Sequence, residues 1–412
     1  MSGRGGEKER GVLVRKESEA DGRSRRRLEG LVGCAAARLA LFKRLPASKC
    51  DLAGMNRRIF LAGAAVAAAW PQSASATERR ATRLVDTTHS TADRVHDGVI
   101  STELTASGPV ASQFDGQIIE NLDIETDSGS GVKVDHRNVT VRHCRIRHAG
   151  GHGVEASNAS AVVIRDCDID HVGAPAIGTD PAAQWDNVHL EDCPGAMLER
   201  IKASRGAANI YAQDCPGAKL RFLELYDARG PEPRGQNVQL NRSADSTLED
   251  FSAENGPTSW TEDNISIFSS DRCAVRRGLV SYNNSPTGDG VMIEGGFGCR
   301  VEDVDALMQG NGAFAAVPLK GSGGGGCAFI RCRTRDSYNT PRDGRDAPSS
   351  NSLSIYVRIS SDAPKHTIED CQYEALANPH NLIWDLRAVN PGWSFVRRPF
   401  MPRPPIRLSF GW

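Results

Sequence analysis

The sequence predicts an all-β solenoid in which short parallel strands stack coil upon coil, and three observations support this fold class. Two different strand-like patterns recur along the chain at similar intervals. Gly accounts for 41 of 412 residues, whereas aromatic residues make up only 6%. Since a fixed period marks repeat architectures and Gly marks turns, many short strands joined by turns are expected in place of helices.

The first pattern is an apolar–polar–apolar strand followed by two polar residues and a small residue or Cys. "NVTVRHCRI" (Asn138–Ile146) recurs as "AVVIRDCDI" (Ala161–Ile169). It returns as "NVHLEDC" (Asn187–Cys193) and, more weakly, as "GAKLRFLEL", "STLEDFSA", "CAVRRGLV" and "CRVEDVDA". Alternation along each strand places one residue inside the coil and the next outside.

The second pattern is a short alternating strand led by Gly or Asn. It occurs as "GVKV" (131–134), "GVEA" (153–156), "NIYA" (209–212), "NVQL" (237–240), "NISI" (264–267) and "GVMI" (290–293). Val238 and Ile265 are 27 residues apart, and Ile265 and Val291 are 26 apart. Two patterns with similar periods predict coils that pair with the coils above and below at about 4.8 Å.

Together the patterns resemble the right-handed parallel β-helix of the pectate-lyase-like superfamily, over roughly residues 95–375. The resemblance implies a single-stranded solenoid of about ten coils, with variable loops on one side that wall a binding groove. It leaves the function open, because lyases, hydrolases, epimerases, phage tailspikes and non-catalytic adhesins share this fold. Leucine-rich and hexapeptide solenoids fit less well, since the period varies and neither motif recurs.

Both ends of the predicted solenoid differ from the repeats. Residues 77–94 are polar and are interpreted as a linker or the start of an N-terminal cap. Residues 376–412 end in "RRPFMPRPPIRLSFGW", which cannot continue a regular ladder because Pro lacks a backbone N–H. We expect this segment to be a C-terminal cap that covers the last coil. A partner-binding Pro-rich tail is the alternative.

The N-terminal 76 residues are predicted to lie outside the fold. Residues 1–54 are rich in Arg, Gly and Ala and are interpreted as a non-structural extension, so that Met55 is a candidate start. Residues 55–76 combine Arg57–Arg58, an apolar run from Ile59 to Trp70 and the small triplet Ala74–Ala76. This order is typical of a bacterial export signal, and "NRRIFLAG" resembles a twin-arginine signal. The sequence therefore predicts a periplasmic or extracellular protein.

The charge of the predicted body excludes one class of partner. Residues 77–412 hold 35 basic and 44 acidic residues, a net charge of −9. Nucleic-acid binding needs a basic footprint, so nucleic acid is not expected as a partner. The Ile59–Trp70 run is too short to span a bilayer, and no integral membrane association is expected after signal removal.

The cysteines are predicted to be small buried residues. Nine of the 11 lie in residues 77–412, an odd number, and several fall at a repeat position. We expect no disulfide framework. The alternative is that one or two disulfide bonds form in an oxidising compartment.

A carboxylate pair is the first candidate for chemistry. One position before the Gly or Asn of the second pattern, the chain has Gln236, Asp263, Asp289 and then Asn311. Asp263 and Asp289 would lie one coil apart, roughly 5 Å between backbones. Such a pair can act as the acid and base of glycoside hydrolysis, with Glu294 assisting. Gln236 and Asn311 would then contact the substrate.

The same column has a structural interpretation. Asp at the start of a strand caps turns through local hydrogen bonds to the backbone. Stacked Asn237 and Asn264 are then expected to form a ladder inside the turns. In this interpretation the two Asp residues have no catalytic role.

A basic set would serve a different reaction. By resemblance, polysaccharide lyases of this fold use Arg or Lys to take the proton beside a uronate carboxylate, and a cation, often calcium, offsets the carboxylate charge. Lys320, which precedes "GSGGGG" (321–326), and Arg358 are the candidate bases. Asp263 and Asp289 would then hold the calcium ion. No other cofactor is expected, and solvated surface charge is the alternative interpretation of the basic residues.

A second resemblance is local. "GHG" (151–153) and "RIK" (200–202) occur in the order and approximate spacing seen in polygalacturonases of this fold. The resemblance implies that His152 supports the catalytic carboxylates and that Arg200 and Lys202 bind a uronate. The Asn-Thr-Asp and paired-Asp motifs that precede the His in that family are absent, which leaves the acid and base unassigned.

Aromatic residues follow the second pattern and suggest a sugar-binding groove. Trp185, Tyr211 and Trp260 lie in or near its loops, and Trp260 comes three residues before Asp263. Packing at turns is the alternative role for such rings.

The leading hypothesis is an exported enzyme that cleaves a polysaccharide by hydrolysis or β-elimination. The alternatives are a non-catalytic carbohydrate-binding solenoid and a structural envelope protein.

Overall fold

The computed structural model describes residues 103–175, 185–230, 235–257, 259, 261–285, 288–335, 353–374 and 382–412. The predicted extension, export signal and linker (1–54, 55–76 and 77–94) lie outside these residues and stay predictions. In the part of the chain that the structure describes, no helix has the length and hydrophobicity of a membrane span.

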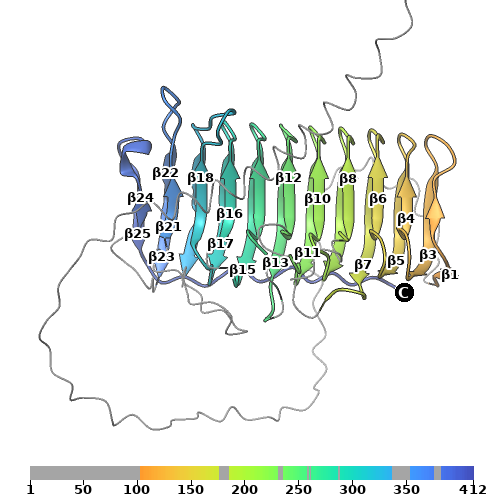
Figure 1. The fold of residues 1–412 in the computed structure, drawn as a ribbon. Helices are drawn as coiled ribbons and strands as arrows, with labels where there is room; N and C mark the ends of the chain where they lie inside the picture. Colours follow the sequence, from red (N-terminus) through yellow and green to blue (C-terminus); the bar gives the residue numbers. More distant parts are fainter. Residues whose placement is uncertain are drawn as a thin grey trace, which may run out of the picture. The chain divides into compact units, whose positions relative to one another are not determined.

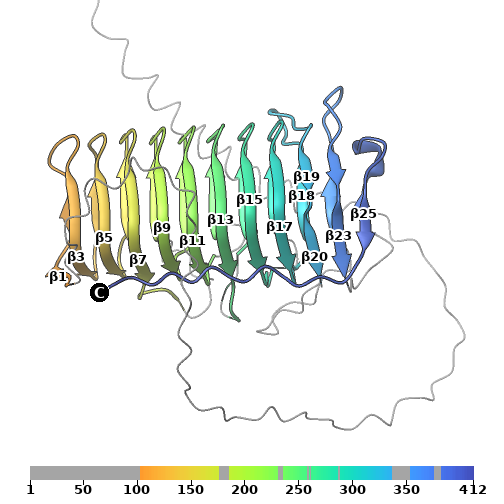
Figure 2. The same ribbon diagram turned by 180° about the vertical axis from the view of Figure 1, so that it is seen from behind.

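The described chain forms two parallel sheets, and each coil contributes strands to both (Figures 1 and 2). The 14-stranded sheet contains β1 (Thr105–Ser107), β3 (Ile118–Thr126), β5 (Thr140–His148), β7 (Val163–His171), β9 (Met197–Ser204), β11 (Lys219–Tyr226), β13 (Thr247–Glu254), β15 (Ala274–Ser281), β17 (Arg300–Leu307), β19 (Ala328–Ile330), β20 (Arg333–Arg335), β22 (Thr367–Glu369), β23 (Cys371–Glu374) and β25 (Phe395–Arg397).

The 11-stranded sheet consists of β2 (Val110–Ala111), β4 (Val132–Val134), β6 (Val154–Ser157), β8 (Val188–Glu191), β10 (Ile210–Gln213), β12 (Val238–Asn241), β14 (Ile265–Phe268), β16 (Asp289–Glu294), β18 (Gly312–Val317), β21 (Leu353–Val357) and β24 (Ile383–Trp384). A single-turn 3₁₀ helix, η2 (Leu386–Ala388), follows β24.

The register confirms the predicted stacking. Val238 pairs with Ile265, and Ile265 pairs with Val291, as the 27- and 26-residue intervals predict. Along β6, β8 and β10 every second side chain is buried, and the others point outward. The buried apolar side chains of successive coils form one continuous core, because a coil alone cannot cover its inner face.

One repeat copy belongs to the other sheet. We predicted "NVHLEDC" (Asn187–Cys193) in the first pattern, but β8 pairs with β6 and β10 in the 11-stranded sheet. The corresponding strand of the 14-stranded sheet in that coil is β9. The error arises because short alternating strands look alike in both sheets, so the alternation alone does not distinguish them.

The Asn ladder is also confirmed. The side-chain amide of Asn187 donates to Asn209, Asn209 to Asn237, and Asn237 to Asn264, at 2.7, 2.7 and 2.9 Å. All four side chains are buried. Each amide thus satisfies its neighbour one coil away, and the ladder fixes where the preceding residue of each coil lies.

The nine cysteines of the described residues are buried and free, as predicted. They do not share one column, however. They form separate thiol stacks: Cys144 with Cys167, Cys193 with Cys215, Cys273 with Cys299 and Cys327, and Cys332 with Cys371. Several inward corners of the coil accept a small side chain, so Cys does not mark a unique position.

The chain ends in an extended segment, residues 398–412, called here the C-terminal strap. It runs across the strands of the 14-stranded sheet, from β25 towards β5 (Figure 2). The backbone amide of Arg403 donates to Asp305, and that of Leu408 donates to Glu224. The strap thus binds the face of the sheet. The role of residues 376–412 as a cap of the last coil stays a prediction.

Candidate functional site

The predicted carboxylate pair is inside the turns. Asp263 and Asp289 are 1% and 0% exposed. The backbone amide of Asp289 donates to Oδ1 of Asp263 at 2.8 Å, and the amide group of Asn311 lies 3.4 Å from Oδ1 of Asp289. The two residues are one coil apart, as predicted, but a sugar cannot reach them from outside. This geometry agrees with the turn-capping interpretation.

The other residues predicted around this pair are spread over different environments. Gln236 is buried in the same column, whereas Glu294 ends β16 and is half-buried. Lys320 is exposed beyond β18, and the Arg358 guanidinium lies 5.3 Å from the centroid of the Tyr356 ring. Trp260 lies outside the described residues. The calcium site at Asp263 and Asp289 stays a prediction.

The three residues of the polygalacturonase-like pattern lie on different sheets. His152 precedes β6 of the 11-stranded sheet, whereas Arg200 and Lys202 lie on β9 of the 14-stranded sheet. Arg200 pairs with Asp166 at 2.6 Å and Lys202 with Asp168 at 3.9 Å. Among the described residues, no contact joins either side chain to His152.

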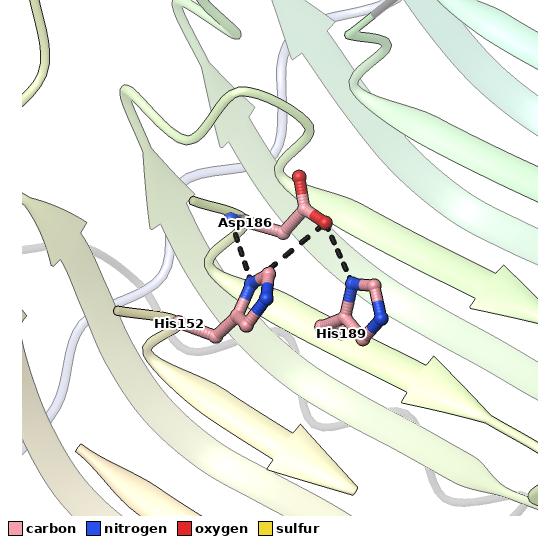
Figure 3. A group of neighbouring side chains, drawn as sticks. All are labelled: His152, Asp186 and His189. Carbon is pink, nitrogen blue, oxygen red and sulfur yellow. Dashed lines mark hydrogen bonds and ion pairs between the residues drawn. The ribbon is translucent and has the colours of Figure 1, made fainter. Parts of the chain in front are cut away.

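His152 instead belongs to a cluster with Asp186 and His189 (Figure 3). The ladder of backbone hydrogen bonds places His152 and Asp186 in the column that continues to Gln236, Asp263 and Asp289. Asp186 directly precedes Asn187, the first Asn of the ladder, while His189 points outward from β8. Two successive coils therefore build the cluster.

Asp186 is the centre of this cluster. Its Oδ2 lies 2.8 Å from Nδ1 of His189 and 3.8 Å from Nδ1 of His152. Its Oδ1 accepts a hydrogen bond from the backbone amide of Ala208 at 2.8 Å, and its own amide donates to Nδ1 of His152 at 3.0 Å. The carboxylate is thus held on two sides, which fixes the orientation of both imidazoles.

Aromatic rings continue the cluster over three coils. The ring centroids of His152 and His189 are 4.3 Å apart, and Tyr211 stacks on His189 at 5.1 Å. Trp185 meets His152 edge to face at 5.3 Å. The Tyr211 hydroxyl donates to Gln213 at 2.7 Å and accepts from Asn241. The result is a row of flat rings with polar edges on the outward face of the sheet.

The titrating groups of this row are perturbed in different directions. Burial lowers the pKa of His152, and the charge of Asp186 opposes this effect only in part. Burial also acts to lower the pKa of His189, but the hydrogen bond and charge of Asp186 outweigh it and raise that pKa. Burial raises the pKa of the Tyr211 hydroxyl. Perturbed groups gathered at one accessible place are typical of functional sites.

The side chains of His152, Asp186 and His189 are 14, 12 and 24% exposed, so the cluster is partly open to solvent. One nitrogen or oxygen atom from each lies within 4.8 Å of the others, close enough for one metal ion.

A separate hollow of about 510 Å³ lies between the C-terminal strap and the 14-stranded sheet. Its lining includes Asp303, Arg331, Arg333 and Arg403. Its charges pair with one another, as Asp303 does with Arg331 at 2.7 Å.

Comparisons with known proteins agree with this architecture. The family model described as "Right handed beta helix region" matches residues 99–220. The fold is a right-handed parallel β-helix. A comparison with curated proteins gives no match.

Several solved structures are similar to this chain at low identity. The A-modules of the Azotobacter vinelandii mannuronan C-5 epimerases AlgE6 and AlgE4 are 13 and 12% identical, with TM-scores of 0.47 and 0.43. The aligned regions cover 73 and 68% of this chain, and 80 and 77% of those chains. An alginate lyase from Paenibacillus sp. is 10% identical over 71% of this chain and 98% of its own, with a TM-score of 0.28.

Sequence reasoning missed the centre of this β-helix site. The sequence suggests Trp185 and Tyr211 as groove residues and His152 as a support for catalytic carboxylates, but it does not single out Asp186 or His189. The signal was present, because Asp186 precedes an Asn-led strand as Asp263 does. Placing Asn187–Cys193 in the first pattern removed Asp186 from the column in which it belongs.

Proposed function

We propose that this protein is a carbohydrate-active enzyme that binds a polysaccharide across β6, β8 and β10 and cleaves it by β-elimination. One observation carries the proposal. The imidazole of His189, oriented by Asp186, stacks on the ring of Tyr211 with the centroids 5.1 Å apart, on a partly open face. An oriented imidazole beside a hydroxyl is a suitable pair for general acid–base catalysis.

The ring row supports binding of a chain-like substrate. Trp185, His152, His189 and Tyr211 follow one another without a break across successive coils. Rings of this kind offer apolar faces and polar edges together, which suits the mixed surface of a sugar. Because the row crosses several strands, it can contact more than one sugar unit.

The proposed step uses the two residues in different roles. His189 donates its Nδ1 hydrogen to Asp186, which leaves the lone pair of Nε2 free to accept a proton. Nε2 takes the proton from the sugar carbon that bears the carboxylate of a uronate. The electrons of that C–H bond form the double bond as the adjacent bond to the glycosidic oxygen breaks. The Tyr211 hydroxyl turns its hydrogen from Gln213 to that leaving oxygen and gives up the proton, which leaves a tyrosinate.

Hydrolysis by Asp263 and Asp289 has less support, since both carboxylates are buried and bonded inside the turns. The same observation favours a second candidate, a non-catalytic carbohydrate-binding protein of the cell surface. In that case the ring row binds a glycan, and no bond is broken. Export to the periplasm or the exterior is part of both proposals and rests on residues 55–76 alone.

A panel of neutral and uronate-containing polysaccharides separates these functions. Reducing ends and the ultraviolet absorbance of unsaturated products are followed together with the full chain, with and without calcium. New absorbance on a uronate polymer supports β-elimination, and reducing ends without absorbance support hydrolysis. No product together with measurable glycan binding would assign the binding function.

A further inference from the structure

We propose that His152, Asp186 and His189 form a binding site for a divalent transition-metal ion of the zinc or cobalt class. The three candidate ligand atoms are Nδ1 of each His and Oδ2 of Asp186 (Figure 3). Oδ2 lies 2.8 Å from one nitrogen and 3.8 Å from the other. Ligands about 2.0–2.2 Å from a tetrahedral ion lie roughly 3.3–3.6 Å apart, so small shifts bring all three onto one ion.

The ligand types select the class of metal. Two imidazoles with one carboxylate suit zinc, cobalt or nickel, whereas calcium takes six to eight oxygen ligands. Among the described residues, this is the one group of His, Cys, Asp and Glu side chains close enough for a shared ion. Three protein ligands leave an open coordination position, which the partial exposure of His189 directs towards solvent.

The surroundings already orient the ligands. Nδ1 of His152 accepts the amide hydrogen of Asp186, so the hydrogen of the ring is on Nε2. Coordination through Nδ1 requires this tautomer, and the ion then takes the lone pair that the Asp186 amide now occupies. The Ala208 amide holds Oδ1 of Asp186 and leaves Oδ2 for the ion. His189 is stacked between His152 and Tyr211. Such outer contacts commonly fix the rings of metal-binding His residues.

Coordination changes the state of His189. In the metal-free protein its Nδ1 carries the hydrogen shared with Asp186. Binding of the ion takes the lone pair of Nδ1, so the remaining hydrogen moves to Nε2. The ring then cannot accept a proton from a substrate. If the proposed β-elimination is correct, the metal therefore inhibits it, and this consequence alone rests on the proposed function.

Titration with Co²⁺ and with Zn²⁺ tests the site directly. The full chain, freed of metal by a chelator, is followed by calorimetry and by the visible absorption of Co²⁺. The wild type is expected to bind one ion that His189→Gln, Asp186→Asn and His152→Gln each weaken at least tenfold. The control is His136→Gln. It removes a His that lies 3.0 Å from the carboxylate of Asp135, where the described residues offer no third His, Cys, Asp or Glu ligand.

Thermal unfolding of each variant shows that the fold is intact. Equal affinity in the wild type and all three cluster variants would overturn the site, as would an equal loss in His136→Gln. Product formation is measured separately with and without Zn²⁺. Binding without any enzymatic product would retain the metal site and reject the proposed reaction, whereas activity insensitive to bound Zn²⁺ would reject the inhibition.

Discussion

The backbone amide of Asp289 donates a hydrogen bond to Oδ1 of Asp263, 2.8 Å away in the neighbouring coil. This bond links two turns of the β-helix at a buried position. The bond gives Asp263 a structural role. The sequence pattern around Asp263 is compatible with this role and with a catalytic one. The two roles lead to opposite expectations for substitutions.

Asp263→Ala is expected to lower the free energy of unfolding by about 1–3 kcal/mol, because a buried amide loses its acceptor. Asp263→Asn keeps an oxygen in that place and is expected to cost less and to retain catalytic activity. Urea unfolding and product assays measure both effects. A folded Asp263→Asn protein without activity would instead support the hydrolytic carboxylate pair.

The Asn ladder is expected to be a main contributor to stability. Asn237→Ala leaves the side chains of Asn209 and Asn264 without their shared partner in a buried place, which costs about 2–3 kcal/mol. Gln239→Ala on the outward face of the same strand is the matched control, with an expected change below about 0.5 kcal/mol. Comparable losses in the two variants would contradict the ladder.

Stability is expected to fall in mild acid because of His171. Burial, with a smaller contribution from the neighbouring His148, lowers the pKa of His171 to about 4. The unfolded chain therefore takes up a proton below its ordinary pKa of about 6.5, while the folded state resists protonation. This contribution is full above pH 6.5 and is lost as the pH falls towards 4, by about 2–3 kcal/mol.

Urea unfolding at a series of pH values between 4 and 8 measures this slope. His171→Gln is expected to make the slope shallower. The remaining slope belongs to other buried imidazoles such as His148 and His366, whose pKa values burial also lowers. A slope that His171→Gln leaves unchanged would contradict the assignment.

The C-terminal strap is expected to stabilise the 14-stranded sheet. Glu224 and Asp305, 3 and 0% exposed, bind its backbone amides. Ending the chain at Arg397 removes these bonds and is expected to lower the free energy of unfolding by about 2–5 kcal/mol. Met401→Ala, at an 85% exposed position of the strap, should have little effect on unfolding. A truncated protein as stable as the full chain would show that the strap contributes nothing.

The cysteine stacks predict an unreactive native protein. The nine cysteines of the described residues are buried, which keeps a reagent from their sulfur atoms. Burial also raises the pKa of the Cys167 and Cys332 thiols, and thiolate is the reactive form. In reducing-agent-free buffer, a thiol reagent should detect at most Cys34 and Cys50 before unfolding and all 11 cysteines after it. Fewer than 11 thiols in the unfolded protein would reveal a disulfide.

The sequence was sufficient to predict the stacking of β12, β14 and β16, because regular intervals and Asn237 and Asn264 mark equivalent positions. It was not sufficient where the intervals are irregular. The assignment of β8 failed there, and with it the place of Asp186. Assigning a strand to the wrong sheet changes which residues are predicted to be neighbours. A site built from two coils is therefore missed when one of its strands is misassigned.

The strap shows a different limit. Trp412 lies beside His143, and Leu408 bonds to Glu224. The Pro-rich composition predicted an irregular end segment, but neither periodicity nor local propensity indicates which distant surface such a segment covers. Contacts between residues so far apart in the chain depend on the assembled sheet.

A comparison of His189→Gln with Asp263→Asn on uronate-containing polysaccharides tests the proposed active site most directly. Ultraviolet absorbance and reducing ends are followed together for the wild type and both variants. We predict unsaturated product from the wild type, a loss of at least a hundredfold in His189→Gln and near-normal rates in Asp263→Asn. Reducing ends without absorbance, retained in His189→Gln and lost in Asp263→Asn, would contradict this account.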